Sequence, residues 1–404
     1  IKSVDKIPKW KRDVPEKMER VAKQPERETF KPQDLVDVYG VRGVEYGNWM
    51  DEESSKLHTQ LAGLAFNDLA DILGIENSTI SYNGRLAVAF GARGMGAIGW
   101  KDSAPSAHYE SEKMVINLTK FSGGGSLAHE WGHFLDNIVA RISNGDKVGK
   151  RVYLSANDAG PEMPVEVTEA FKKLTEAIHD GARPAGALVR PNPKKEKYTW
   201  DRVDKRLATE PAQKIYDELA AKYDQEEARA LKMAENYSDP KNVEKAKARA
   251  TRKANMNRKA AAEYLATKTN SIIRMVKSGE RKAVSDYVAV ARIMGEYESD
   301  PKELFARAFE SYIQDKLTSQ QMKNSYLVYG TEDRPDERML WINPQDNPEY
   351  PYILEATKKG EDSLPYFAYP RGEERKKINE AMETFVETLR GSEMFTKSLM
   401  LALE

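Results

Sequence analysis

The sequence predicts an α+β fold that is predominantly helical and contains a small antiparallel or mixed sheet. Three observations support this prediction. Apolar residues recur at helical spacing in several segments, short runs of β-branched and apolar residues occur before residue 120, and an Ala-, Lys-, Glu- and Arg-rich stretch fills residues 211–278. At 404 residues, the chain is long enough for two or three structural units.

The composition narrows the function classes. The formal net charge is -1 and 31% of the residues are charged, which is typical of a protein with much solvated surface. No apolar run approaches the roughly 18 residues that cross a bilayer, so we expect no membrane insertion. The chain contains no cysteine, which excludes disulfides and thiolate ligands, so a bound zinc ion would need His, Asp or Glu. The first residue is Ile, and we expect this N terminus to reflect processing, trimming or excision from a longer chain.

The first 120 residues predict an arm, a helix and three strands. Residues 1–34 are rich in Lys, Glu and Pro and predict an arm that is loose or wraps the main body. Leucines at helical spacing predict an amphipathic helix over residues 51–73, which Gly74 ends. Residues 79–82 and 86–90 flank Asn83-Gly84, the dipeptide best suited to a tight hairpin, so we expect two antiparallel strands. Residues 114–118 predict a third strand.

A metal-binding motif follows the third strand. It reads His129-Glu130-Trp131-Gly132-His133, hereafter the HEWGH motif. On a helix, residues four apart lie on one face, so both imidazoles can reach one ion while the intervening carboxylate lies beside a water molecule. This arrangement indicates metal-assisted hydrolysis with Zn²⁺ as the cofactor.

Flanking residues extend the motif. Ser126 lies where a helix N-cap is expected. Apolar residues mark one face of the helix, and Asp136 shares the opposite face with the two histidines. Asp136 is placed to support an imidazole by a hydrogen bond, although a helix-surface Asp without that contact fits the pattern nearly as well.

Glu303 is the best candidate for a third zinc ligand. Catalytic zinc takes three protein ligands, so one more must come from elsewhere in the chain. Asp300 resembles an N-cap and Pro301 a first helical residue, which places Glu303 in the first turn of a helix. Two alternatives remain open: Asp300 and Glu303 also have the spacing of a capping box, in which Glu303 would bond back to the amide of the cap, and Glu310, two turns further on, competes as the ligand.

Two long antiparallel helices are expected at residues 211–236 and 241–278. The region from Lys241 to Lys259 carries eight basic residues, which suggests a nucleic-acid partner. A solvated helix face is the favoured interpretation, because these residues scatter around the helix and the whole chain is nearly neutral. A final amphipathic helix contains Ile378, Met382, Phe385 and Leu389. The predicted organisation is an arm (1–34), a lobe with the HEWGH helix (35–145), a loop and helical-hairpin insertion (146–284) and a second lobe (285–404).

The HEWGH motif and the run from Glu303 to Glu310 together resemble the gluzincin metallopeptidases, especially the anthrax lethal factor type. Over roughly residues 35–140 and 285–390, including the segment from Arg371 to Arg375, the chain also resembles the large polyvalent protein-associated domain of phages and conjugative elements.

The resemblance implies a zincin-like fold and a set of roles. His129 and His133 would be zinc ligands, Glu303 the third ligand, Glu130 the general base, and Tyr297 an oxyanion donor. One departure is visible. Many gluzincins place an Asp that supports the first histidine four residues after the ligand Glu, and this chain has Arg307 there.

The expected function is therefore a zinc-dependent metallopeptidase that hydrolyses peptide bonds, encoded by a phage or mobile element. Its substrate would be a peptide or protein, including its own polyprotein, and it would be cytoplasmic or virion-associated and delivered into the host cell. The alternative is an inactive zincin scaffold that binds DNA or protein and is delivered with mobile DNA.

Overall fold

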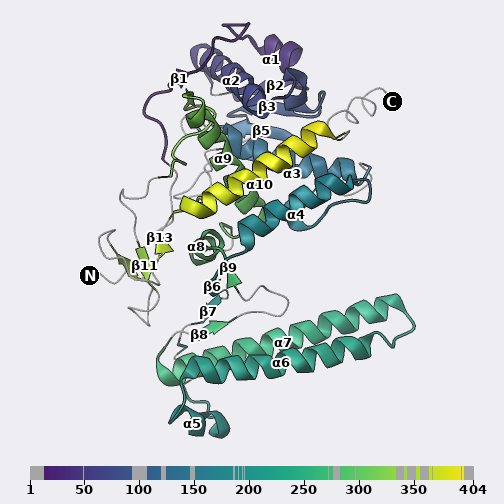
Figure 1. The fold of residues 1–404 in the computed structure, drawn as a ribbon, viewed down its shortest axis with the longest axis vertical. Helices are drawn as coiled ribbons and strands as arrows, with labels where there is room; N and C mark the ends of the chain where they lie inside the picture. The colour runs from purple at the N-terminus through teal and green to yellow at the C-terminus, as the bar shows by residue number, and fades with distance from the viewer. Residues whose placement is uncertain are drawn as a thin grey trace. The chain divides into compact units, whose positions relative to one another are not determined.

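The computed structural model describes residues 13–48, 50–92, 107–119, 124–145, 151–184, 187–189, 191, 192, 194, 196–271, 273–275, 283–295, 297–333, 341–343, 352–354, 364, 365, 367–392 and 394 (Figure 1). The fold is mixed α+β and mostly helical, with a small sheet, as predicted. The chain divides into two compact units. One comprises residues 1–8, 180–292 and 336–366, here called the hairpin unit, and the other comprises residues 9–179, 293–335 and 367–404, here called the HEWGH unit. Among the described residues, none of the helices combines the length and apolarity that a bilayer span requires.

The HEWGH unit contains a four-stranded mixed sheet in the order β2-β3-β5-β4. Its strands are β2 (Val44–Tyr46), β3 (Ala87–Phe90), β5 (Val115–Leu118) and β4 (Ala107–Glu110). Strands β2, β3 and β5 are parallel, and β4 pairs antiparallel with β5 at the edge. All four residues of β5 are buried, as expected for an inner strand with both faces covered.

The predicted hairpin at Asn83-Gly84 is wrong. Residues Asn77–Ser81 form a short 3₁₀ helix (η1), and only the second predicted strand exists, as β3. The dipeptide does take positive φ angles, 54° at Asn83 and 88° at Gly84, but it follows a helical turn. The dipeptide therefore adopts the expected backbone angles, whereas β3 takes its partners from distant segments in parallel pairs.

Helix boundaries follow the capping signals in the sequence. Helix α2 (Glu52–Leu73) begins after Asp51, whose carboxylate accepts a hydrogen bond from Ser54 N, and ends at Gly74 with φ 62°. This confirms the predicted helix. The other elements of the HEWGH unit are α1 (Pro32–Tyr39), α3 (Leu127–Ser143), η2 (Leu154–Ala156), α4 (Val165–His179), α9 (Pro301–Ser319), β10 (Lys323–Asn324) and α10 (Gly372–Gly391).

Helix α9 packs directly against α3 on one side and against α10 on the other. A Cβ atom at Gly132 would lie 3.4 Å from Ala306 Cα, so the glycine of the HEWGH motif allows close approach of the two backbones. Trp131 packs on Phe309 with ring centroids 5.4 Å apart. On the other side, Phe305 contacts Phe385 of α10. These contacts fix α9 beside the face of α3 that carries His129 and His133.

The described part of the N-terminal arm is tied to the HEWGH unit. Strand β1 (Arg20–Val21) pairs antiparallel with β10. The guanidinium of Arg20 bonds both carboxylate oxygens of the buried Asp68, at 2.9 and 2.6 Å. The arm therefore wraps the body from residue 13 on, and residues 1–12 lie outside the described residues.

The hairpin unit contains α6 (Ala212–Ala234) and α7 (Pro240–Thr269), which pack along each other as the predicted helical hairpin. Helix α7 ends at Asn270 with φ 46°, earlier than expected, because the chain then enters β8 (Ile273–Met275). The core of this unit includes Ile215, Tyr216 and Leu265, each at most 2% exposed. Its remaining elements are β6 (Arg183–Pro184), β7 (Ala187–Val189), α5 (Asp201–Leu207), β9 (Ala283–Val284), the start of α8 (Asp286–Met294), β11 (Trp341–Asn343), β12 (Tyr352–Leu354) and β13 (Leu364–Pro365).

Candidate metal centre

Three residues from two helices converge in the HEWGH unit. His129 and His133 lie one turn apart on α3, and Glu303 lies in the first turn of α9. One ligand atom from each lies within 4.8 Å of the other two. Glu303 Oε2 is 3.5 Å from His129 Nε2, and Glu303 Oε1 is 3.2 Å from His133 Nε2. A single carboxylate therefore faces the same nitrogen of both imidazoles.

The start of α9 presents Glu303 to the histidines. The Asp300 carboxylate accepts a hydrogen bond from Lys302 N at 3.0 Å, and Pro301 is the first helical residue, as predicted. The capping-box alternative would direct the Glu303 side chain back to the Asp300 amide. Instead its oxygens lie against the imidazoles, and the side chain is 8% exposed.

Glu310 lies on the opposite side of His129. Its Oε2 is 3.3 Å from His129 Nδ1, and the residue is fully buried. The two carboxylates thus face different nitrogens of one imidazole. A carboxylate at Nδ1 holds the ring orientation and makes Nε2 the better metal ligand. The group of converging ligand atoms is therefore His129, His133 and Glu303, and Glu310 lies at the other nitrogen of His129.

Arg307 connects the ligand carboxylate to its surroundings. Its guanidinium lies 3.3 Å from Glu303 Oε2 and also donates to the Glu298 carbonyl at 3.3 Å. The same group lies 5.9 Å from the centroid of the Tyr297 ring. The departure from the gluzincin pattern at Arg307 thus places a cation, only 5% exposed, beside the candidate ligand.

The Glu130 carboxylate and the Tyr297 hydroxyl lie at the same site. Glu130 is 5% exposed, and its negative charge raises the pKa of both His133 and Tyr297. Although 64% of the surface of Tyr297 is exposed, its hydroxyl hydrogen-bonds to Glu303. Burial of the hydroxyl and the charge of Glu303 raise the pKa of Tyr297 well above its usual range, so the hydroxyl keeps its proton.

Burial and mutual charge set the protonation of the three converging residues. Burial lowers the pKa of His129 to about 4, despite the opposing charge of Glu303. Burial also opposes the charged form of His133, but there the carboxylate of Glu303 prevails and the pKa rises. Burial would raise the pKa of Glu303, yet the charge of His133 and hydrogen bonds from both imidazoles hold it well below its usual range. Glu303 is therefore ionised, as a metal ligand must be.

Asp136 follows His133 by three residues on α3 and is fully buried, so it is not a helix-surface Asp. Its carboxylate accepts hydrogen bonds from Ser155 N at 2.9 Å and from Ser155 Oγ at 2.5 Å. Burial raises its pKa to about 6, and its charge raises the pKa of His133. Sequence reasoning missed Ser155, because no local pattern links a serine in the short 3₁₀ helix η2 to a helix residue 19 positions earlier.

Comparison with known families adds an independent observation. Residues 292–393 match the family model of large polyvalent protein-associated domain 1. No curated protein and no solved structure matches the chain. The matched segment contains Tyr297, Glu303, Arg307 and Glu310, and the HEWGH motif lies outside it. The resemblance over residues 35–140 remains a prediction.

The polyvalent-domain match includes the buried Arg375 at the start of α10. Its guanidinium forms two hydrogen bonds of 2.7 Å with the Asp315 carboxylate of α9. It also donates to the Thr331 carbonyl at 2.6 Å. These hydrogen bonds of Arg375 therefore stabilise the packing of α10 on α9, the helix that carries Glu303.

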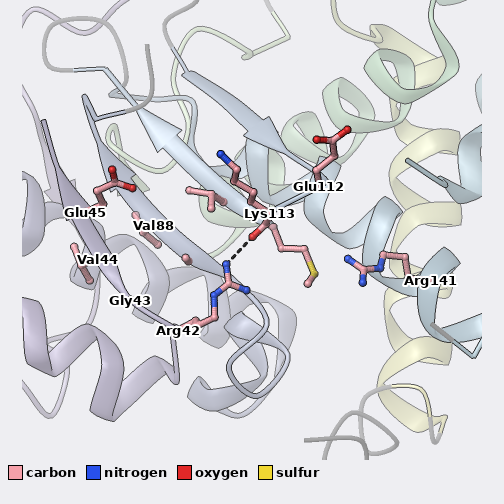
Figure 2. A pocket seen from close by; sticks show the side chains of 11 residues that line it. Arg42, Gly43, Val44, Glu45, Val88, Glu112, Lys113 and Arg141 are labelled. Atoms are coloured by element: carbon pink, nitrogen blue, oxygen red, sulfur yellow. Dashed lines mark hydrogen bonds between the residues drawn. The ribbon is translucent and has the colours of Figure 1, made fainter. Parts of the chain in front are cut away.

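A separate cavity of about 500 Å³ lies at the amino ends of the parallel strands (Figure 2). Val44, Ala87 and Val115, the first residues of β2, β3 and β5, all line it. The Arg42 guanidinium spans its edge by donating to the Arg85 and Lys113 carbonyls at 2.8 and 2.6 Å. The residues that line this cavity do not include the candidate zinc ligands.

Proposed function

We propose that this chain is a zinc-dependent metallopeptidase of the gluzincin type, with a zincin-like HEWGH unit. The supporting observation is the convergence of His129 Nε2, His133 Nε2 and the Glu303 carboxylate from two packed helices. Two His and one Glu form a donor set typical of catalytic zinc, which leaves a fourth position for water or substrate.

The distances fit the proposed ion. Ligand atoms about 2.0–2.1 Å from a tetrahedral zinc are separated from each other by about 3.3 Å. Each imidazole Nε2 lies 3.2 or 3.5 Å from a Glu303 oxygen, close to that separation. The low pKa of His129 favours the neutral imidazole that binds metal, whereas His133, whose pKa is raised, would release its proton when the ion binds. The Glu310 carboxylate also lies 3.3 Å from His129 Nδ1, the side of the ring on which zinc-bound histidines usually have a carboxylate or carbonyl partner.

When bound, the ion would supply a Lewis acid that polarises a peptide carbonyl and makes water acidic enough to ionise near neutral pH. Glu130 would accept a proton from the water while the water oxygen forms a bond to the carbonyl carbon. As the C–N bond breaks, Glu130 would return that proton to the leaving amine, so the carboxylate is regenerated. Its place beside His133 and Tyr297 supports this role, because its charge acts on both.

Tyr297 would donate its hydroxyl proton in a hydrogen bond to the oxyanion that develops during attack. The raised pKa of Tyr297 keeps the donor protonated at all working pH values. Arg307 would hold Glu303 from the side away from His133, since it contacts Oε2 whereas His133 contacts Oε1. Both residues lie in the segment that matches the polyvalent domain, which is in keeping with a phage or mobile-element protein delivered into a host cell.

Metal analysis and peptide cleavage test the proposal together. Purified protein should contain one zinc ion per chain, and His133→Ala should contain none. A random peptide library should be cleaved by the zinc-loaded protein and not by Glu130→Gln, which keeps the ligands and removes the base. Absence of stoichiometric zinc in the unaltered protein would refute the proposed site. Stoichiometric zinc without cleavage of the library or of a longer precursor would instead favour the non-catalytic scaffold.

A further inference from the structure

Helix α7 presents a continuous basic face that the proposed peptidase does not use. At about 100° per residue, six of its exposed cations fall within an arc of roughly 120°. They are Lys241, Lys245, Arg249, Arg252, Lys253 and Lys259. The buried residues of this stretch, Ala254 and Arg258, lie on the opposite side, which packs toward α6. The sequence expectation that the cations scatter around the helix is thus wrong for these six.

The two remaining basic residues of the region have structural roles. Arg258 is 1% exposed and pairs with Asp224 and with Glu227 at 3.1 Å. Lys247 pairs with Glu235 at 3.3 Å across the hairpin. These two side chains therefore hold α6 against α7. Both lie on the side of α7 that packs toward α6, outside the basic arc.

Nearby acids pair with only one of the six cations of the basic face among the described residues. Lys259 lies 4.0 Å from Glu263 at the end of the face. The other five form no ion pair with any residue in the described part of the chain. Glu244 is the one acid between Lys241 and Lys259, and the helical period places it about 60° outside the arc. In contrast, α6 exposes both signs, including Lys214, Asp217, Glu218, Lys222 and Glu226.

Packing gives no reason for this one-sided charge. The core of the hairpin unit uses α7 residues from Ala261 onward, so the basic face extends along the part of the helix with least apolar burial. The formal net charge of the whole chain is -1, so these cations are a local concentration and not part of a basic surface everywhere. A solvated helix face that serves only solubility needs no segregation by sign.

We propose that the basic face of α7 binds duplex DNA through its phosphates, without reading the sequence. The face extends over 18 residue steps, or about 27 Å, and a duplex of that length carries about 16 phosphate charges. No Phe, Tyr or Trp occurs between residues 240 and 260, so the face lacks the aromatic platforms on which single-stranded bases stack. A regular row of cations complements the regular backbone of a duplex.

The test uses the full chain and a fluorescent 30-base-pair DNA duplex of arbitrary sequence. Binding is measured by the fluorescence anisotropy of the duplex. The informative variant combines four substitutions on the basic face of α7: Lys245→Gln, Arg249→Gln, Arg252→Gln and Lys253→Gln. Glutamine is a good helix former, so α7 should persist, and circular dichroism checks this. The matched control is Lys214→Gln, Lys222→Gln, Arg229→Gln and Lys232→Gln on α6, which removes the same charge from the partner helix.

With four phosphate contacts, affinity should fall roughly 150-fold between 50 and 200 mM salt, a slope of about -3.6 in log units. The α7 variant should lose most of that slope, whereas the α6 control should retain it. Glu130→Gln should bind duplex like the unaltered protein, which separates this surface from the proposed zinc chemistry. Equal loss in the α6 and α7 variants would overturn the proposal. Tighter binding to oligothymidine than to duplex, or no salt-dependent binding at all, would also overturn it.

Discussion

Replacing Arg375 by alanine should loosen the contact between α10 and α9 by a calculable amount. The guanidinium is 2% exposed and donates five hydrogen bonds. Two reach Asp315, and the others reach the carbonyls of Thr331, Ser311 and Pro370. Breaking a buried ion pair by removing one partner costs about 3–5 kcal/mol.

The lower end of that range is expected here. The Asp315 side chain is 38% exposed, so water can replace part of the lost interaction. We therefore expect Arg375→Ala to destabilise the α9–α10 contact by about 3 kcal/mol. Arg375→Lys keeps the charge but cannot form the planar two-bond contact with Asp315, so about half of that loss is expected. The matched control is Lys376→Ala on the same helix, whose solvent-exposed pair with Glu373 should contribute little to stability.

Hydrogen exchange followed by mass spectrometry is the appropriate assay, because a chain with two compact units need not unfold in one step. Peptides from α9 and α10 should exchange roughly 100-fold faster in Arg375→Ala, and peptides from α6 and α7 should be unchanged. Exchange in Arg375→Ala that matches Lys376→Ala would refute the reasoning, since it would show that the buried hydrogen bonds contribute no more than a surface pair.

Three further predictions concern the candidate metal centre. Glu310→Gln should weaken zinc binding about 10–100-fold in a competition titration, because His129 Nδ1 loses its charged partner, and a change of less than twofold would contradict this role. Gly132→Ala places a Cβ atom 3.1 Å from Phe309 Cδ1, so the Phe309 side chain must move by a few tenths of an ångström where α9 packs on α3. Zinc affinity should fall although the melting temperature changes little, because overpacking of about 1–3 kcal/mol is partly offset by a helix-propensity gain of about 1 kcal/mol. For Asp136, burial raises the pKa to about 6, so the folded state holds this proton more tightly and stability decreases as the pH rises from 3.8 through 6. Asp136→Asn should remove roughly 2–3 kcal/mol of that decrease in urea unfolding between pH 4 and 7, and an unchanged pH profile would count against the assignment.

Short-range signals in the sequence predicted helices well and strand pairing poorly. Asp51 and Gly74 mark the two ends of α2 because capping depends on atoms within one turn. Asn83-Gly84 likewise adopts its expected φ angles. The partners of β3, however, are β2 and β5, which lie about 40 residues before it and 30 residues after it. No turn pattern can report such parallel pairing, because the connections are long.

The sequence by itself determined that two imidazoles share a helix face with a carboxylate between them, because the helical period fixes which residues point the same way. It also provided Glu303 and Glu310 as candidates, but could not separate them, since residues seven apart lie within about 20° of each other around a helix. Only the tertiary structure decided that Glu303 faces Nε2 of both histidines and that Glu310 faces Nδ1 of His129. The physical reason is the close packing of α9 on α3 at Gly132, which sets how far each turn of α9 lies from each imidazole.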